Sequence, residues 1–347
     1  QPFSAKYFQE SLEFFSFAHE WQALHETAPL AELEKDLEAH SSSEMLSLKQ
    51  LQDFLRSPVK YFFSQRLKIF FEAAEQPLAQ EEPFVLDQLQ LYQASDSLLQ
   101  AALADLDDAD GAMHAQAVRL QSSGLLPMAG FGTALQRELI DPLPEVLQRY
   151  TELRERWPQP LNSALSLSFV HDDSGVSDWL EGVCQDSDGG LLSVTTIPNT
   201  IAAGRSRKWH RLVKPWVTHV VACACGLRLT SAMVAKDQTL LLPPLETPVA
   251  SEILITMLQA YQQGMQKPLP VALRTAFAAL EKADPVKAYE GDDFTHKGER
   301  EETAPARQYP DFSALTESGE FFHWCDLLYK PLLEAPWQSI TRKEAEA

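Results

Sequence analysis

The residues of this chain best suited to chemistry are cations in its longest stretch without an acid, which runs from residue 189 to residue 236. They are Arg205, Arg207, Lys208, Arg211 and Lys214, with Trp209 and Trp216 between them. Guanidinium and ammonium groups attract phosphate oxygens, and an indole ring can stack on a base. The pattern therefore indicates contact with a nucleic-acid backbone, with Arg205, Arg207, Lys208, Trp209, Arg211 and Lys214 as the candidate DNA-binding residues.

Two other interpretations of the same residues stay open. The cations could form a solvated loop that balances the acidic surface around it, or they could meet an acidic partner subunit. A second basic group consists of Lys60, Arg66 and Lys68. For that group we favour the simpler interpretation, in which long side chains reach solvent from a packed pair of helices.

Side chains that commonly bind metals form no recognisable pattern, and no metal site is predicted. Cys223 and Cys225 lie two apart on an expected helix, about 200° around its axis, so they cannot share one ion. His210 and His219 lack the His-x-x-x-His spacing that would suggest zinc. Four cysteines in a chain of 347 residues do not suggest a disulfide framework, so we expect reduced thiols.

The whole chain is acidic, with a formal net charge of -20. This charge argues against a surface that grips DNA everywhere, but a local basic patch can act within a Debye length, about 8 Å at physiological salt. No apolar run approaches the roughly 20 residues that span a bilayer, and the first residues do not resemble a signal peptide. We therefore expect a cytoplasmic protein without membrane contact. The sequence does not start with methionine, as expected of a fragment of a longer chain or of a processed N-terminus.

The first part of the chain is expected to be helical. Residues 1–45 are interpreted as a helical extension with a hinge at 41–44, and residues 46–160 as a helical entry to a larger domain. Ser47 and Gln50 have the spacing of a capping box, and Ser57-Pro58 ends one helix and starts another. The apolar stripe of that second helix is Val59, Phe62, Phe63, Leu67 and Phe70. Further helices are expected over 86–121, interrupted by an acidic loop at 105–110, and over about 132–150.

From residue 163 the pattern changes to short strands. ALSLSFV, WLEGV and GLLSVTTI look like three strands, with turns at Gly175 and Gly189-Gly190. A helix from Pro215 to Cys225 precedes two more strands, LRLTSAMV and TLLLPP, and another helix covers 249–263. We therefore expect a domain over 46–347, with a sheet core over 161–275. Its last part, 276–347, is expected to be a polar loop over 284–320 followed by a helix over 320–334.

The stretch SLKQLQDFLRSPVKYFFSQRL, residues 47–67, resembles the entry helices of nuclease domains in the RecB/AddB group of DNA end-processing enzymes. As a whole, the chain is similar to the C-terminal part of the RecC family, the gamma subunits of exodeoxyribonuclease V. Four further stretches carry this resemblance in the same order: LPMAGFGTALQRELIDPL, LVKPWVTHVVACACG, YQQGMQKPLPV and KAYEG. The similarity covers the chain from about residue 46 to residue 315.

This resemblance implies an α/β fold of the restriction-endonuclease-like, or PD-(D/E)xK, type, with a central mixed sheet flanked by helices and a helical N-terminal extension. Active nucleases of this type carry one acid on a first strand and Asp/Glu-x-Lys on a second. Alternate residues of a strand share a face, and carboxylates there hold Mg²⁺ beside the lysine. Matched to that motif, the first acid falls on Glu181, the second on Thr196 and the lysine on Pro198. None of the fourteen lysines has an acid two residues before it, so the motif is absent.

The resemblance also raises the question of a cofactor. Some relatives hold an iron–sulfur cluster through a cysteine just before the proline of the entry corner, where this chain has Ser57. We therefore predict no cofactor.

The function implied by the resemblance is that of a non-catalytic, nuclease-like subunit fragment of a RecBCD-type DNA helicase-nuclease in double-strand break repair. It would bind DNA ends, help to separate and guide the strands, and dock RecB-like and RecD-like subunits. Its nucleic-acid partners would be double-stranded DNA ends and single-stranded DNA. Two alternatives stay open. One is a metal-dependent DNA nuclease with a migrated motif, in which Glu138 or Asp141 joins Glu181, and the other is a protein–protein scaffold.

Overall fold

The structure is a computed structural model that describes residues 37–38, 45–71, 86–127, 129–204, 206–292 and 297–340. All but the first pair belong to one compact unit, Ala39–Ala347, and the account below concerns that unit. The helices expected before residue 37 and the hinge expected at 41–44 lie outside the described residues. The division of the chain at residue 45 stays a prediction.

A six-stranded mixed sheet, in the order β1-β4-β5-β8-β9-β10, forms the centre of this unit. Its strands are β1 (Gln159–Pro160), β4 (Cys184–Gln185), β5 (Leu191–Ile197), β8 (Leu229–Ala235), β9 (Thr239–Leu242) and β10 (Gln338–Ile340). β5 and β8 are parallel, and every other neighbouring pair is antiparallel. A parallel pair needs a crossover, and α7 (Val213–Ala224) supplies it on one face of the sheet.

Alternate residues of the central strands enter two different cores. Leu191 and Ile197 of β5 pack with Met233 of β8 in the core that also contains α7. Leu192 of β5 packs with Val234 of β8 in the core on the opposite face. The predicted α/β class, with a central mixed sheet flanked by helices, is therefore confirmed.

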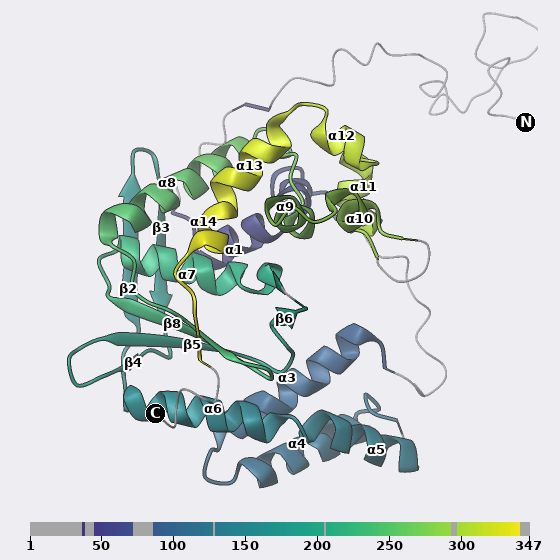
Figure 1. Ribbon diagram of the computed structural model, residues 1–347, viewed down its shortest axis with the longest axis vertical. Helices are drawn as coiled ribbons and strands as arrows, with labels where there is room; N and C mark the ends of the chain where they lie inside the picture. Colours follow the sequence, from purple (N-terminus) through teal and green to yellow (C-terminus); the bar gives the residue numbers. More distant parts are fainter. Residues whose placement is uncertain are drawn as a thin grey trace, which may run out of the picture. The chain divides into compact units, whose positions relative to one another are not determined.

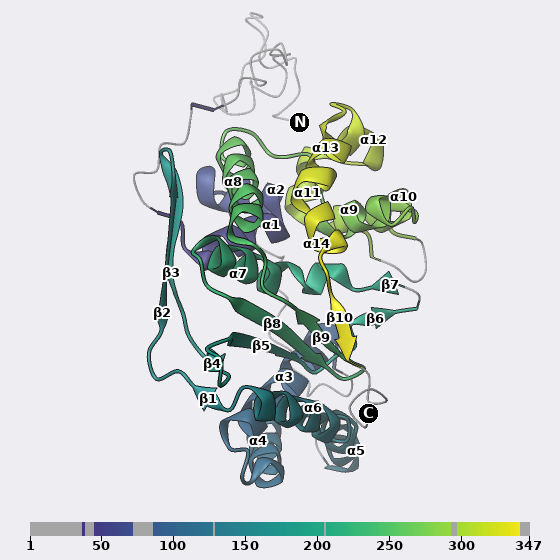
Figure 2. The same cartoon turned by 60° about the vertical axis from the view of Figure 1, so that its left-hand side comes forward.

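Helices cover both faces of the sheet, as Figure 1 and Figure 2 show. On the side of α7 lie α1 (Leu48–Arg56), α8 (Thr247–Gly264), α9 (Leu273–Leu280), α13 (Glu320–Leu328) and α14 (Lys330–Glu334). On the other side lie α3 (Gln88–Ala104), α4 (Ala109–Ser122), α5 (Ala129–Ile140) and α6 (Leu143–Arg156). None of the helices in the described part of the chain is long and apolar enough to cross a bilayer.

The corner at Ser57-Pro58 forms as predicted. The Ser47 hydroxyl accepts a hydrogen bond from the Gln50 backbone N–H, and the Gln50 side chain accepts one from the Ser47 N–H, so α1 starts with a capping box. Pro58 begins α2 (Pro58–Tyr61), which continues as a π-helical turn, η4 (Phe62–Arg66). The apolar stripe predicted beyond that turn is wrong at its end, because the helix stops at Arg66 and leaves Phe70 68% exposed.

Two predictions in the strand region are wrong. Gly175 was expected at a turn, but it lies inside β3 (Ser174–Leu180), which pairs with β2 (Leu165–His171) in a separate hairpin whose turn contains Asp172. A Cβ atom at Gly175 would lie 2.3 Å from the Met45 side chain, so close packing explains this glycine. The stretch WLEGV was expected as one strand, but β3 ends at Leu180 and Gly182 adopts a φ of 67° before β4 begins.

Two predictions in the helical regions are also wrong. The single helix expected over 132–150 is two helices, α5 and α6, because Pro142 has no N–H to continue the ladder. The loop expected over 284–320 contains four short helices, two of which start at the capping side chains of Asp284 and Asp311. They are α10 (Pro285–Glu290), η6 (Glu299–Glu301), α11 (Thr303–Gln308) and α12 (Phe312–Thr316).

Candidate nucleic-acid interface

The positions matched to a nuclease motif hold no carboxylate–lysine pair. Thr196 lies near the end of β5, opposite Val234 of β8, and its hydroxyl accepts a 3.5 Å hydrogen bond from the side chain of Gln100 in α3. Pro198 follows β5 and is buried, whereas Glu181 is exposed between β3 and β4. In the described ranges, no three His, Cys, Asp or Glu side chains gather in an arrangement that could hold a metal. Glu138 and Asp141, the acids considered for a migrated motif, are exposed at the end of α5.

Of the predicted basic residues, Arg207, Lys208 and Arg211 lie on the connection from β5 to α7, and Lys214 lies in the first turn of α7. This connection contains the short hairpin β6 (Ala202–Ala203) and β7 (Ser206–Arg207), followed by the 3-10 turn η5 (Trp209–Arg211). The Lys208 ammonium donates to the Thr200 hydroxyl at 2.8 Å, and the Arg211 guanidinium donates to the Thr200 carbonyl at 3.0 Å. Because they share one residue as acceptor, these two cations are held side by side. Arg205 lies outside the described residues.

Two acids anchor this connection. The carboxylate of Asp237 accepts hydrogen bonds from the backbone N–H groups of Ile201 at 2.9 Å and Ala202 at 2.8 Å. The carboxylate of Glu281 accepts one from the indole N–H of Trp209 at 2.9 Å and another from the Ser206 hydroxyl. The acids therefore fix the backbone near the cations without forming an ion pair with them.

Trp209 is engaged within the chain. Its side chain is buried, its ring stacks on Phe277 of α9 with a centroid separation of 6.3 Å, and its N–H is bonded to Glu281. Arg207 lies over the same ring, with its guanidinium carbon 5.4 Å from the centroid. Trp216 is also buried, at 2% exposure. Neither indole ring offers a free face to a base in this arrangement, contrary to the expectation from the sequence.

Among the candidate cations that the structure describes, Lys214 is paired with an acid. Its ammonium lies 3.2 Å from the carboxylate of Asp53 in α1, which also lies 2.8 Å from the Lys49 ammonium. Burial raises the pKa of Asp53, but hydrogen bonds from Lys49 and Lys214 more than offset this and hold the pKa below its usual value. The ion pair between Lys214 and Asp53 therefore connects α7 to α1, while part of the Lys214 side chain stays exposed to solvent.

Two arginines that the sequence analysis did not select complete the group of cations. Arg56 ends α1, and Arg274 lies in the first turn of α9, which packs against η5. The basic cluster, as we call it from here, consists of Arg56, Lys208, Arg211 and Arg274. Residues so far apart in the chain carry no local signal that they meet, and a sequence pattern could not have found them.

The charges of these four cations all act on His210. Burial of its ring, followed by the charges of Arg211, Arg274, Lys208 and Arg56, lowers the pKa of His210 to about 4. This histidine is therefore neutral at neutral pH, and the positive charge of the site comes from the basic cluster itself.

The positive charge of the basic cluster is only partly compensated, since the carboxylate of Asp237 acts on both Lys208 and Arg211 without an ion pair to either. Arg274 has a carboxylate nearby, since its Nε lies 3.8 Å from Glu299. Arg56, Lys208 and Arg211 have no carboxylate within ion-pair distance in the part of the chain that the structure describes. Burial and then the Arg211 charge lower the pKa of Lys208. An anion that bound here would relieve repulsion between cations that the fold holds together.

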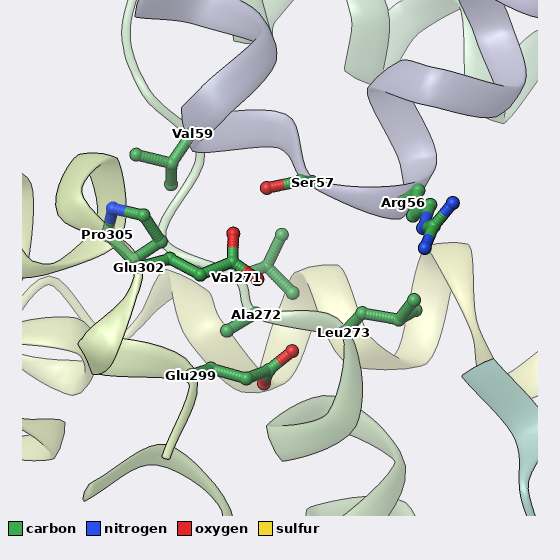
Figure 3. Close-up of a pocket in the computed structure, with 9 residues that line it drawn as sticks. All are labelled: Arg56, Ser57, Val59, Val271, Ala272, Leu273, Glu299, Glu302 and Pro305. Atoms are coloured by element: carbon green, nitrogen blue, oxygen red, sulfur yellow. The ribbon is translucent and has the colours of Figure 1, made fainter. Parts of the chain in front are cut away.

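A small hollow, partly open to solvent, lies at the Ser57 corner, with Arg56 of the basic cluster in its wall (Figure 3). Its walls are Arg56, Ser57, Val59, Val271, Ala272, Leu273, Glu299, Glu302 and Pro305. Figure 3 shows Arg56 at one end of the lining residues, with Glu302 and Pro305 at the other end. Because the carboxylates of Glu299 and Glu302 repel anions, a phosphate would meet Arg56 at its end of the hollow and not the interior.

Comparison with known proteins gives a consistent result. The sequence model of the RecC C-terminal domain matches residues 43–284. Three proteins named RecBCD enzyme subunit RecC are similar to this chain. The protein from Escherichia coli is 28% identical over 229 residues, which are 66% of this chain and 18% of that protein. The protein from Haemophilus influenzae is 25% identical over 222 residues, or 64% and 19% of the two chains.

The protein from Buchnera aphidicola is 23% identical over 232 residues, or 66% of this chain and 20% of the relative. The chain thus spans about a fifth of the length of these curated relatives. The matched region 43–284 contains the entry corner, all but β10 of the central sheet, and the basic cluster. The chain therefore belongs to the RecC C-terminal domain family.

Proposed function

We propose that this chain is a non-catalytic part of a RecC-type subunit in a RecBCD-type DNA helicase-nuclease that acts in double-strand break repair and recombination. The support is its membership of the RecC C-terminal domain family, together with relatives that are named subunits of the RecBCD enzyme. In such a complex its partners are RecB-like and RecD-like subunits. Its nucleic-acid partners are double-stranded DNA ends and single-stranded DNA.

A restriction-endonuclease-like core over residues 46–347 is part of the same proposal. The supporting features are the entry through the α1–α2 corner and a mixed sheet between two helical layers, in which β5 and β8 are parallel. On this fold the matched positions of a nuclease motif are Glu181, Thr196 and Pro198.

The observation that carries the non-catalytic assignment is the chemistry of the β5 end. Thr196 offers a neutral hydroxyl that is already bonded to Gln100, and Pro198 offers no charge and is buried. One carboxylate, Glu181, then remains where Mg²⁺ would need at least two oxygen ligands from the protein and a lysine beside them. Such a site cannot ready a water molecule for attack on a phosphodiester.

A digestion assay on linear duplex and single-stranded DNA with Mg²⁺ or Mn²⁺ tests this assignment. We expect the same DNA loss from the wild-type chain, from the Glu181→Ala variant and from a control variant at Glu252, an exposed acid in α8. Turnover that Glu181→Ala abolishes and Glu252→Ala leaves intact would show an active nuclease with a migrated motif.

The DNA-contact part of the proposal rests on the cations of the β5–α7 connection. Lys208 and Arg211 act together with Arg56 and Arg274 on His210, and Arg207 and Lys214 lie nearby in the chain. Their combined charge can attract a phosphate backbone locally on an acidic chain. Binding by the isolated chain is expected to be weak because of the net charge of -20. DNA-end binding and strand guiding would therefore be roles of the assembled complex.

A docking role has separate support in the β2–β3 hairpin. Val170 and Trp179 lie on one face of this hairpin and are 66% and 63% exposed. These two exposed side chains offer apolar surface on which a partner protein can pack.

Charge reversal at Arg207 and Lys208 tests whether the cations of the β5–α7 connection contact DNA or a partner subunit in a reconstituted complex. Loss of DNA-end binding with normal assembly supports DNA contact by these cations. Loss of assembly supports a scaffold role for the β5–α7 connection.

A further inference from the structure

Four consecutive residues after the entry corner, Leu67, Lys68, Ile69 and Phe70, are all exposed. They follow the π-helical turn η4 and are called the corner loop from here on. Three of them carry large apolar side chains, and Leu67, Ile69 and Phe70 are 37%, 44% and 68% exposed. The corner loop lies outside the β5–α7 connection and the β2–β3 hairpin, so the roles proposed for those segments do not account for its apolar surface.

The backbone fixes the corner loop in an uncommon conformation. The Leu67 N–H donates to the Phe62 carbonyl at 3.2 Å, and the Ile69 N–H donates to the Phe63 carbonyl at 2.8 Å. Between these two bonds Lys68 has a φ of 56°, in the left-handed region that residues with a side chain rarely adopt. A conformation of this kind costs free energy and persists only where its surroundings fix it, often at a functional site.

The residue after the corner loop is packed, which leaves Phe70 outside the core. The Phe71 ring meets the Phe63 ring edge-on, with a centroid separation of 5.2 Å. Phe71 thereby joins the small core formed by Val59, Phe62, Phe63 and Ala304. The adjacent Phe70 ring has no place in that core. The π-helical turn, the conformation of Lys68 and the packing of Phe71 therefore hold three apolar side chains in solvent.

The surroundings of the corner loop are basic. Residues 54–71 contain no acid and four cations, Arg56, Lys60, Arg66 and Lys68. Lys60 and Lys68 are exposed, and in the part of the chain that the structure describes neither has a carboxylate within ion-pair distance. The helix that packs against α2, α11, contains one cation, Arg307, and no acid. This segment is thus a positive region on a chain whose net charge is -20.

Apolar side chains among unpaired lysines match a protein segment better than a nucleic acid. A phosphate backbone would pair with Lys60 and Lys68, but the branched side chains of Leu67 and Ile69 offer no flat face on which a base can stack. A protein segment with apolar residues on one side and carboxylates beside them can use both features. Its apolar residues would cover the corner loop, and its carboxylates would meet the lysines at the rim.

We propose that the corner loop is a docking site for a partner subunit, which packs an acidic amphipathic segment on Leu67, Ile69 and Phe70 and places carboxylates beside Lys60 and Lys68. This inference rests on the proposed function, in which the chain docks other subunits. It adds the surface used and the chemistry of the segment that binds there. The Phe70 ring is the main anchor because it exposes the most apolar surface, and the lysines steer the approach of the acidic segment.

The first test is association of this chain with the RecB-like and RecD-like subunits, each immobilised in turn and followed by biolayer interferometry. We expect Phe70→Ser to weaken binding to one of them about tenfold or more, because the largest apolar contact is lost. Phe131→Ser, which removes a similarly exposed ring from α5, should bind like wild type. Since Phe70 is 68% exposed, thermal melting of Phe70→Ser should match that of wild type.

A charge reversal tests the predicted acidity of the partner segment. Lys68→Glu should weaken binding about fivefold or more, mainly through slower association, and should make association less sensitive to salt. Arg119→Glu makes the same change in charge at an exposed position on α4 and should leave binding unchanged. An equal effect of the two charge reversals would mean that only the net charge of the chain matters, and it would overturn the assignment of the lysines.

Photocrosslinking in the reconstituted complex identifies the occupant directly. With p-benzoylphenylalanine in place of Ile69, we expect the crosslinked peptide to come from a partner subunit and to contain Asp or Glu among apolar residues. Wild-type affinity of both Phe70→Ser and Lys68→Glu overturns this inference and leaves the proposed function standing. Normal assembly with crosslinks to DNA, and lost DNA-end binding in Lys68→Glu, overturns the docking assignment. Failure of the wild-type chain to bind either subunit overturns both.

Discussion

The hydroxyl group of Tyr329 donates a 2.7 Å hydrogen bond to the backbone carbonyl of Leu55, and both residues are 1% exposed. Leu55 is in the last turn of α1, where carbonyl groups lose their partners because the chain turns at Ser57-Pro58. A side chain from the far end of the sequence therefore satisfies a buried acceptor at the entry corner. The helices after residue 320 are thus part of what holds that corner in place.

Removal of this hydroxyl should destabilise the fold. In Tyr329→Phe the Leu55 carbonyl is left buried without a donor, so we expect the free energy of unfolding to fall by about 1–3 kcal/mol. Urea denaturation followed by circular dichroism measures the change. Tyr150→Phe is the control, since its hydroxyl has no hydrogen-bond partner in the described structure, and it should change stability by less than about 0.5 kcal/mol. Equal losses in the two variants would contradict the role of the Tyr329 hydroxyl.

Gly264, the last residue of α8, allows α8 to approach α1 closely. A Cβ atom there would lie 2.5 Å from the Phe54 ring, which is fully buried and packs edge-on against Tyr61 and Tyr261. Because the ring has no room to move, we expect Gly264→Ala to lower the free energy of unfolding by about 1–3 kcal/mol.

The matched control for this glycine is Gly130 in α5, where an added Cβ atom has nothing within 4 Å. Gly130→Ala should be neutral or stabilise the chain by up to about 1 kcal/mol, because alanine favours the helix. Thermal melting of both variants measures the contrast. Similar changes in the two variants would mean that helix propensity, and not contact with Phe54, decides the effect of Gly264→Ala.

His219 makes the stability of the fold depend on pH. Its ring is fully buried in α7 and hydrogen-bonded to the Ser231 hydroxyl at 2.9 Å, and burial lowers the pKa of His219 from 6.5 to about 4. Between these two values the unfolded chain binds more protons than the folded chain, so stability falls as pH falls from 6.5 to 4. The full effect of one such histidine is about 3 kcal/mol. His210, whose pKa is also lowered to about 4, acts in the same direction.

Urea denaturation at neutral pH and at acidic pH within this window measures the effect. We expect His219→Gln to lose part of the pH dependence, and the double variant with His210→Gln to lose more. His114→Gln, at an exposed position on α4, serves as the control and should keep the wild-type dependence. An unchanged slope in His219→Gln would show that the buried ring does not titrate over this range.

The elements that the sequence predicted well are those fixed by neighbours in the chain. The capping box of Ser47 and Gln50 and the helix start at Pro58 depend on local backbone chemistry, and both form as predicted. β5 and β8 were recognisable because they are apolar runs of strand length. Gly175 was wrongly predicted at a turn, because it is needed for close packing against Met45. A sequence pattern cannot distinguish a glycine required by packing from a glycine required by a turn.

The candidate interface was less accessible to sequence reasoning. The acid-free run identified Lys208 and Arg211, because consecutive residues of like charge are visible in the sequence. It could not reveal that Phe277 of α9 and Glu281, which follows this helix, engage the Trp209 ring. Nor could it reveal that Arg56 and Arg274 join the cations, since only tertiary packing brings these elements together.

Glu299 holds the start of α9 beside this interface, and its replacement should lower the stability of the chain. Its buried carboxylate accepts hydrogen bonds from the N–H groups of Arg274 at 2.9 Å and Thr275 at 2.8 Å, and from the Thr275 hydroxyl at 2.8 Å. These are donors of the first turn of α9, which also carries Phe277 and leads to Glu281. In Glu299→Ala the donors are buried without an acceptor, so we expect a loss of about 2 kcal/mol or more.

Variants at the same hollow separate the role of the Glu299 oxygens from the role of its charge. Burial raises the pKa of Glu299 although the three hydrogen bonds lower it, so the charged form carries a desolvation cost that glutamine avoids. Glu299→Gln should therefore destabilise the chain less than Glu299→Ala, because its amide oxygen still accepts from α9. Glu302→Ala, an exposed acid that lines the same hollow, should stay within about 0.5 kcal/mol of wild type in urea denaturation. A loss in Glu299→Gln equal to that in Glu299→Ala would show that the negative charge, and not the acceptor geometry, stabilises the start of α9.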